Sequence, residues 1–247
     1  MTTTAQNKVA LVTGASRGIG AAIAERLAKE GFTVIVNYSR GAEAADALVQ
    51  RIEQAGGRAV SAQADVSDSA AVAKMFASAE QAFGGIDVLV NNAGVMPLSS
   101  IADTDDATFD SLIDINLKGT FNTLREAAKG MRNGGRIINF SSSVVGLYQP
   151  TYGVYAATKA AVEAMSRVLT KELRGRQITV NSVAPGPTAT DLFFNGKSEQ
   201  LIETISKVAP LERLGQPEDI AAVVAFLAGP DGAWINGQTL RANGGII

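Results

Sequence analysis

The sequence contains no cysteine and no histidine among its 247 residues. The absence of cysteine excludes disulfides, thiol nucleophiles and iron–sulfur clusters. The absence of histidine excludes a Ser-His-Asp triad and removes the usual ligand of catalytic zinc, so we expect no metal site. Any acid–base chemistry must therefore fall to tyrosine, lysine or a carboxylic acid.

Strong charge and long apolar runs are also missing. The formal net charge is −2 at pH 7, which gives no electrostatic basis for binding nucleic acid or an anionic membrane. The longest apolar run, Ile220–Gly229, is too short to span a bilayer. The opening segment Met1–Asn7 is polar and lacks the apolar stretch of a signal peptide. These features predict a soluble, cytoplasmic protein.

Short runs rich in Val, Ile and Leu alternate with helical patterns along the chain. The predicted strands are Lys8–Thr13, Thr33–Asn37, Arg58–Gln63, Ile86–Asn91, Arg136–Ser141, Ile178–Val183 and Gln238–Ala242. The predicted helices are Ile19–Glu30, Ala42–Ala55, one running from Ser67 as its N-cap to Phe83, a pair between Thr104 and Arg132, Tyr152–Leu173, Ser198–Lys207 and Pro217–Ala228. This alternation predicts a single α/β domain over residues 1–247, with a three-layer, doubly wound parallel sheet of about seven strands and helices on both faces.

A glycine-rich loop joins the first predicted strand to the first helix. Its sequence is Thr13-Gly14-Ala15-Ser16-Arg17-Gly18-Ile19-Gly20. The first glycine permits a tight turn, the second lets the backbone approach a pyrophosphate, and the third lets the helix pack closely on the sheet. The helix amino end then offers N–H groups and a positive dipole to phosphates. Because the loop stands between a strand and a helix, we expect Gly14, Ser16, Arg17, Gly18, Ile19 and Gly20 to bind a dinucleotide rather than form an ordinary turn.

The end of the second strand indicates which dinucleotide is bound. An acid about 20 residues beyond the fingerprint binds the ribose 2′-hydroxyl of NAD, whereas a basic neighbourhood admits the 2′-phosphate of NADP. Here the strand ends Asn37-Tyr38-Ser39-Arg40, with no acid. We expect Arg17 and Arg40 to supply positive charge, with donors on Asn37 and Ser39, so NADP(H) is preferred over NAD(H). The alternative is that Arg40 is merely solvated.

Asp65-Val66 follows the third predicted strand. A carboxylate at this strand end is placed to accept the adenine amino group. A lone aspartate at a strand end is equally consistent with a residue at the start of the next helix.

Three motifs together resemble the short-chain dehydrogenase/reductase family. They are T-G-x-x-x-G-x-G at Thr13–Gly20, Asn91-Asn92-Ala93-Gly94 after the fourth strand, and Tyr155-x-x-x-Lys159. The resemblance runs from about Lys8 to Gly245, and three motifs in this order are specific although each alone is common. It implies a Rossmann-type fold and an NAD(P)-dependent oxidoreductase that interconverts a carbonyl and an alcohol.

The resemblance also implies roles for individual residues. Asn116 matches an asparagine that interrupts a helix and anchors a water in a proton relay, and Ser142 matches a serine that positions the substrate. Tyr155 matches the general acid/base and Lys159 the lysine that binds the nicotinamide ribose. Ser143 remains the rival of Ser142, because Ser141–Ser143 are consecutive serines. The segments expected around the nicotinamide are Asn92, Ala93 and Gly94, and Pro185, Gly186 and Thr188.

The tyrosine–lysine pair is chemically consistent with this role. Residues four apart on a helix share a face, so Tyr155 and Lys159 should be neighbours. A free tyrosine has a pKa of about 10, and an acid/base near neutrality needs roughly three units less, or about 4 kcal/mol. An ammonium about 4 Å away, at an effective dielectric near 20, supplies on the order of 4 kcal/mol. The pair is therefore expected to work without a metal or a histidine.

We expect a lid at about 187–210 and a ketone, aldehyde or 3-oxoacyl thioester as substrate. The overall resemblance is closest to 3-oxoacyl-[acyl carrier protein] reductases, in which Arg176 matches an arginine that binds the carrier protein. The second basic position of that surface, near Arg132-Asn133, matches imperfectly.

Other members of the family remain alternatives. They are a general ketone, aldehyde or sugar reductase and, in a different class, an inactive cofactor-sensing or scaffold protein on the same fold. The resemblance further implies a homotetramer.

Overall fold

A computed structural model describes residues 8–247, so the predicted absence of a signal peptide at Met1–Asn7 lies outside the described residues. The strands are β1 Val9–Val12, β2 Thr33–Tyr38, β3 Arg58–Gln63, β4 Val88–Asn91, β5 Arg136–Phe140, β6 Thr179–Pro185 and β7 Thr239–Ala242. The helices are α1 Gly18–Lys29, α2 Ala42–Gln54, α3 Ser69–Phe83, α4 Asp106–Leu112, the π-helix η1 Ile113–Lys118, α5 Gly119–Gly130, α6 Val144–Leu147, α7 Gly153–Glu172, α8 Asp191–Phe194, α9 Glu199–Ser206, α10 Pro217–Ala228 and the short 3₁₀ turn η2 Pro230–Gly232.

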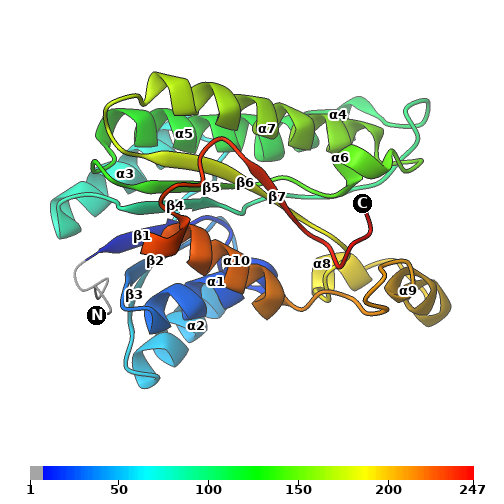
Figure 1. The fold of residues 1–247 in the computed structure, drawn as a ribbon, viewed down its shortest axis with the longest axis horizontal. Coiled ribbons are helices and arrows are strands. Elements are labelled where there is room, and N and C mark those ends of the chain that lie inside the picture. Colours follow the sequence, from blue (N-terminus) through cyan, green and yellow to red (C-terminus); the bar gives the residue numbers. More distant parts are fainter. Residues whose placement is uncertain (1–7) are drawn as a thin grey trace.

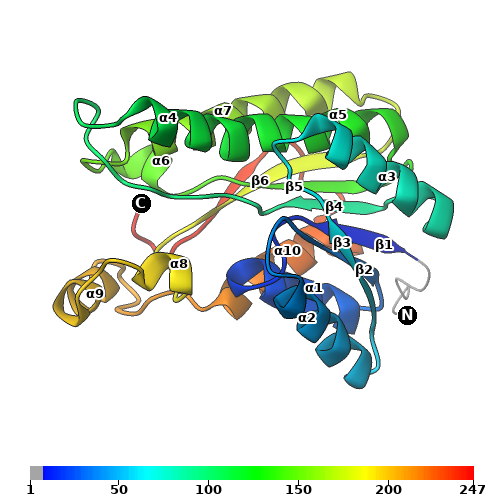
Figure 2. The same ribbon diagram turned by 180° about the vertical axis from the view of Figure 1, so that it is seen from behind.

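The seven strands form one sheet in the order β3-β2-β1-β4-β5-β6-β7, and every neighbouring pair is parallel. Figures 1 and 2 show α1, α2 and α10 on one face, and α3, α4, α5 and α7 on the other. The predicted three-layer, doubly wound α/β fold is therefore confirmed. Both views also show α8 and α9 beyond the carboxyl ends of the strands, where ligands of such sheets bind.

Alternation along the strands fills two cores. In β1, Ala10 and Val12 face the core under α1, α2 and α10, whereas Val9 and Leu11 face the core under α3, α5 and α7. A strand buried on both faces is the pattern expected of a parallel sheet. Because both faces are covered by close-packed helices, the strand ends are held firmly, and the loops that follow them have fixed starting points.

Several local predictions were wrong. The N-cap of α3 is Asp68 rather than Ser67, since the Asp68 carboxylate accepts hydrogen bonds from the backbone N–H groups of Ala70 and Ala71. The pair of helices between Thr104 and Arg132 is continuous through the π-helix η1, which hydrophobic spacing did not predict. The short helices α6 and α8 were also not predicted. None of the helices within residues 8–247 is long and apolar enough to cross a membrane.

Candidate active site

The glycine loop between β1 and α1 is built to face an anion. Gly14 and Gly18 have positive φ of 59° and 57°. A methyl group on Gly14 would lie 2.9 Å from the Cα of Ala93, and one on Gly20 would lie 2.6 Å from Asn92 Nδ2. No side chain caps the amino end of α1 and its first turn contains no acid, so its N–H groups and dipole are available to a phosphate.

The loop after β4 is fastened to this glycine loop. Asn92 Nδ2 donates to the carbonyl oxygens of Thr13 and Gly14 at 2.9 and 3.0 Å. The Thr13 hydroxyl oxygen accepts from the backbone N–H groups of Asn92 and Ala93. Thr13 was not predicted as a site residue, although the T-G pair of the motif includes it. Asn92 and Thr13 therefore act as positioning residues that hold the two loops together.

The end of β2 differs in part from its predicted role. Asn37 is buried, and its amide group donates to the carbonyls of Ala62 and Ala64 while its Oδ1 accepts from the Gly14 N–H. Asn37 is therefore not free to donate to a 2′-phosphate, contrary to the prediction, and instead fixes the glycine loop against β3. The Tyr38 side chain is buried in the core. Arg17, Ser39 and Arg40 are exposed, but the Ser39 hydroxyl, also predicted as a donor to the 2′-phosphate, donates to Asp65 Oδ2 at 3.2 Å.

Asp65 is held by hydrogen bonds from its neighbours. Its Oδ1 accepts from the N–H and hydroxyl of Ser67, and its Oδ2 accepts from the Ser39 hydroxyl. The hydrogen bond from the Ser67 side chain, reinforced by the Ser67 and Ser39 bonds and the charge of Arg40 against some desolvation, lowers the pKa of Asp65. The carboxylate therefore stays ionised at neutral pH. Val66 is buried beside it and contacts Gly119.

Tyr155 and Lys159 lie on α7 next to the end of β5. Lys159 is 4% exposed, and its Nζ donates to the Phe140 carbonyl at 2.9 Å and lies 5.7 Å from the centroid of the Tyr155 ring. The Ser142 hydroxyl lies close enough to the Tyr155 phenol to lower the pKa of that phenol. Ser143 points elsewhere, because its hydroxyl donates to the Ala184 carbonyl and accepts from Asn243 Nδ2. The geometry thus places Ser142, rather than Ser143, beside the phenol.

The predicted electrostatic effect of Lys159 on Tyr155 is not what dominates in this structure. Burial raises the pKa of Tyr155 to about 12, opposed by the Ser142 hydrogen bond, and the neighbouring Tyr152 raises it further. Burial also lowers the pKa of Lys159 to about 8. The expected lowering of the phenol pKa assumed an ammonium directly beside the oxygen. Here the ammonium is bonded to the Phe140 carbonyl instead, and desolvation decides the direction.

Asn116 lies in the π-helix and is fully buried. Its side-chain oxygen accepts from the Val95 N–H at 2.8 Å and its amide group donates to the Val95 carbonyl at 2.9 Å. A methyl group on Gly94 would lie 3.2 Å from Asn116 Oδ1 and 3.6 Å from Lys159 Nζ. The structure therefore brings Asn116, Gly94 and Lys159 together. The helix is widened at Asn116 rather than broken.

A ladder of buried polar side chains fixes α7 against the sheet. Each rung is a hydrogen bond between fully or almost fully buried side chains. In order, the ladder links Thr123 to Asn91, Asn91 to Asn139, Asn139 to Ser166, and Ser182 to Ser166. It connects α5, β4, β5, α7 and β6. Asn139 directly precedes Phe140, whose carbonyl accepts the hydrogen bond from Lys159 Nζ, so the ladder also sets where Lys159 is held.

The segment after β6 turns back over the glycine loop. Gly186 N–H donates to the Ala242 carbonyl, and the hydroxyl of the buried Thr188 donates to the Gly186 carbonyl. A methyl group on Gly18 would lie 3.5 Å from Thr190 Cγ2, so the segment reaches the phosphate loop. Beyond it, α8 and α9 present exposed apolar side chains, as does the loop after α6: Leu192, Phe194, Leu201 and Tyr148.

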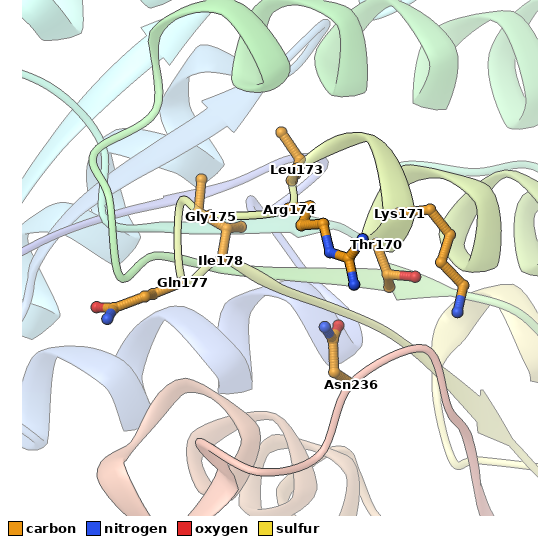
Figure 3. Close-up of a pocket in the computed structure, with 8 residues that line it drawn as sticks. All are labelled: Thr170, Lys171, Leu173, Arg174, Gly175, Gln177, Ile178 and Asn236. Atoms are coloured by element: carbon orange, nitrogen blue, oxygen red, sulfur yellow. The ribbon is translucent and has the colours of Figure 1, made fainter.

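A separate depression of about 540 Å³ lies at the far end of α7 (Figure 3). It is lined by Thr170, Lys171, Leu173, Arg174, Gly175, Gln177, Ile178 and Asn236. Thr170 is fifteen positions beyond Tyr155 on the same helix, which corresponds to roughly 22 Å. None of the predicted site residues lines this depression, so it is separate from the candidate active site.

The chain is similar to known proteins over nearly its whole length. Residues 14–247 match the family model described as Enoyl-(Acyl carrier protein) reductase. A short-chain type dehydrogenase/reductase of Picea abies is 49% identical, covering 97% of this chain and 92% of its own. An NADPH-dependent aldehyde reductase-like chloroplastic protein of Arabidopsis thaliana is 43% identical, covering 97% and 94%.

A solved structure resembles the fold as well. The crystal structure of the angucycline C-6 ketoreductase LanV with bound NADP superposes with a TM-score of 0.92 at 38% identity, covering 98% of this chain and 96% of that one. The chain is therefore similar to these oxidoreductases in sequence and in fold over nearly its full length. The chain belongs to the short-chain dehydrogenase/reductase family.

Proposed function

We propose that the protein reduces the carbonyl group of a small ketone or aldehyde to an alcohol with NADPH, with Tyr155 as the general acid. The observation that carries this proposal is the meeting of Ser142, Tyr155 and Lys159 near a glycine loop and an uncapped helix amino end that can bind an anion. In a family of oxidoreductases, this arrangement supplies both a cofactor cradle and a proton donor.

The residues present fit NADP(H). A Cβ on Gly14 or Gly20 would collide with Ala93 or Asn92, so the tight loop requires glycine at both positions, and the amino end of α1 lacks a side-chain cap. No acid directly follows β2, where one would repel a 2′-phosphate. Arg40 is exposed at that strand end and Arg17 is exposed on the glycine loop. The NADPH-dependent relative from Arabidopsis thaliana and the LanV structure with bound NADP support this choice.

When bound, the cofactor supplies the hydride that is transferred to the carbonyl carbon. The chain's own residues handle the oxygen. Tyr155 donates its phenolic proton to the oxygen, and the Ser142 hydroxyl donates a hydrogen bond to it as negative charge builds. Lys159, held by the Phe140 carbonyl, places a positive charge behind the phenol, and Asn116 fixes the loop that contains Gly94.

The substrate we favour is an apolar ketone or aldehyde. Large apolar side chains are exposed on α8, on α9 and after α6, among polar neighbours; they are Leu192, Phe194, Leu201 and Tyr148. We place the lid at about 187–210, which includes α8 and α9. The aldehyde reductase-like relative and the ketoreductase LanV act on carbonyl compounds by their names, which supports this class.

The two arginines that could bind a carrier protein, Arg176 and Arg132, form hydrogen bonds within the chain. Arg176 donates to Asn133 Oδ1 and to the carbonyls of Ala128 and Met131. Arg132 is likewise bonded to Asp87 and to the carbonyls of Phe83 and Gly84. Both guanidinium groups are thus engaged inside the chain, which leaves little for the phosphate or carboxylates of a carrier protein.

A homotetramer in the cytoplasm remains part of the proposal. Helices α4, α5 and α7 expose large apolar side chains that a partner subunit would cover, namely Phe109, Phe121 and Val168. Trp234, in the C-terminal region, is 99% exposed. Light scattering of the purified protein tests the assembly.

The first experiment measures the rate of NADPH oxidation, with NADH as the control, on an aldehyde, a ketone and an acetoacetyl thioester. We expect turnover of the aldehyde or ketone with NADPH. Turnover confined to the thioester would instead support the 3-oxoacyl reductase function. If NADPH binds with saturable fluorescence but none of these carbonyl compounds causes its oxidation, the protein would instead be the inactive sensor.

Removing the charge of Arg40 should weaken the binding of NADPH but not that of NADH. A charge-assisted hydrogen bond is worth about 1.5–3 kcal/mol, so Arg40→Ala should raise the KM for NADPH about tenfold or more and leave the KM for NADH within about twofold. Steady-state kinetics with both cofactors measures this. The matched control is Arg58→Ala. Arg58 is an exposed arginine at the amino end of β3, whereas Arg40 follows the carboxyl end of β2. Equal losses with both cofactors would show that Arg40 does not contact the 2′-phosphate.

A further inference from the structure

The segment that follows β7 runs between the two halves of the site. It begins in contact with both catalytic loops. The place for a Cβ on Gly186 is 2.8 Å from the Cα of Asn243, so the two backbones touch. Asn243 Nδ2 also donates to the Ser143 hydroxyl at 3.0 Å, across 100 residues of sequence. The segment is thus fastened beside Ser142 and beside the loop expected to cover the nicotinamide.

Two glycines then turn the chain toward the lid. Gly244 and Gly245 have positive φ of 68° and 89°, and the Gly245 N–H donates to Asn243 Oδ1. The place for a Cβ on Gly244 is 3.1 Å from Ala209 Cβ, and that on Gly245 is 3.3 Å from Pro210 Cγ. The segment therefore packs against Ala209 and Pro210, which follow α9.

The last contact returns to the catalytic side. Ile247 Cδ1 lies 2.7 Å from where a Cβ on Gly146 would be, and a guanidinium nitrogen of Arg241 lies 3.4 Å from the same point. Gly146 is in α6, four residues after Ser142. Figure 1 shows the carboxyl end of the chain between α6 and the pair α8 and α9. Ile247 packs on α6 on one side and remains 39% exposed on the other.

From these contacts we propose that Asn243–Ile247 forms a wall of the substrate cleft, and that the pair Gly146 and Ile247 sets how bulky an apolar carbonyl compound the site accepts. The inference rests on the proposed reductase function. The wall connects the loop that contains Ser142 with the lid. Its aliphatic side chain, Ile247, packs against Gly146, which has no side chain of its own. Removing the Ile247 branch enlarges the cleft, whereas a methyl on Gly146 pushes Ile247 into it.

The test uses two aldehydes of different bulk, propionaldehyde and 2-naphthaldehyde, with saturating NADPH. One methylene in an apolar pocket changes kcat/KM about tenfold or more. We therefore expect Ile247→Ala to raise kcat/KM for 2-naphthaldehyde relative to propionaldehyde about tenfold, and Gly146→Ala to lower that ratio. Because both changes act at one contact, adding Ile247→Ala to Gly146→Ala should cancel most of the loss. Val60→Ala, on the edge strand β3, is the control for an exposed aliphatic truncation.

The two hypotheses fail in different ways. A wild-type protein that reduces neither aldehyde overturns the proposed function, and with it this inference. A wild-type protein that reduces them, with an unchanged substrate ratio in both variants, overturns the wall alone. Melting temperature and NADPH binding of each variant show that it is folded. Equal loss for both aldehydes with weakened NADPH binding would likewise contradict a role in substrate size.

Discussion

Replacing Tyr155 with phenylalanine should lower kcat by about 10²–10⁴-fold, the contribution typical of a general acid, while NADPH binding stays unchanged. The substitution removes only the hydroxyl. The ring keeps its edge contact with Tyr152, at a centroid distance of 6.3 Å, and its place below the Lys159 ammonium. The cofactor cradle lies on α1 and the loop after β4 and is not altered. Stopped-flow or steady-state rates, with fluorescence titration of NADPH, measure both quantities.

Tyr152→Phe is the matched control for this variant. Tyr152 lies three positions earlier, and burial raises its pKa in the same direction as that of Tyr155. Loss of its hydroxyl should change kcat by less than about threefold, since no hydrogen bond to the reacting oxygen is assigned to it. A Tyr155→Phe enzyme that keeps more than a tenth of the wild-type kcat would show that another group donates the proton.

The fold could be predicted because its signals are local. Glycines at 31, 56, 57, 84 and 85 stop successive helices, and apolar runs of strand length recur between them, so alternation alone implies a parallel sheet. Parallel order then brings the carboxyl ends of β1, β4 and β5 to one edge, and the motif residues follow those ends. For this reason the sequence also indicated which side chains meet.

The rest depends on contacts that sequence spacing does not encode. The π-helix at Ile113–Lys118 shifts hydrogen bonds by one residue and leaves the apolar pattern almost unchanged. Asn37 and Arg176 are polar residues whose partners are backbone carbonyls on other elements, so their donors looked free. The hydrogen bond between Asn243 and Ser143 joins residues 100 positions apart. Each of these required the packed structure.

The direction of the Tyr155 pKa shift has the same origin. An estimate from spacing can place an ammonium near a phenol, but it cannot include the desolvation of both groups in a packed site. Burial raises the pKa of Tyr155 and lowers that of Lys159, so both neutral forms are favoured. A bound cofactor with a cationic oxidised ring would favour the tyrosinate, which makes the protein without cofactor a poorly poised base.

Replacing Lys159 with methionine should lower kcat/KM by at least about 10²-fold and at the same time stabilise the fold at neutral pH. The loss of rate follows from losing charge-assisted hydrogen bonds, each worth about 1.5–3 kcal/mol, when about 1.4 kcal/mol is a factor of ten. The gain in stability follows from burial. The Lys159 pKa is about 8 in the folded chain against an ordinary value of 10.5, so the unfolded chain binds the proton more tightly.

The sign of the pH dependence follows from that difference. Below pH 8 the folded wild type bears the full cost of a buried ammonium, about 3 kcal/mol at roughly 1.4 kcal/mol per pKa unit, and this cost disappears as the pH rises toward 10.5. The raised pKa of Tyr155 acts oppositely above pH 10, but it is present in both proteins and cancels in their difference. The unsatisfied Phe140 carbonyl offsets about 1–3 kcal/mol of the gain.

Urea unfolding of the wild type and of Lys159→Met at pH 7, 8, 9 and 10 measures this difference. We expect the free energy of unfolding of the wild type to rise relative to the variant across this interval, with most of the change above pH 8. Lys171→Met, an exposed lysine on the same helix, should show no such slope. A constant difference between wild type and Lys159→Met would mean that Lys159 keeps an ordinary pKa in the fold.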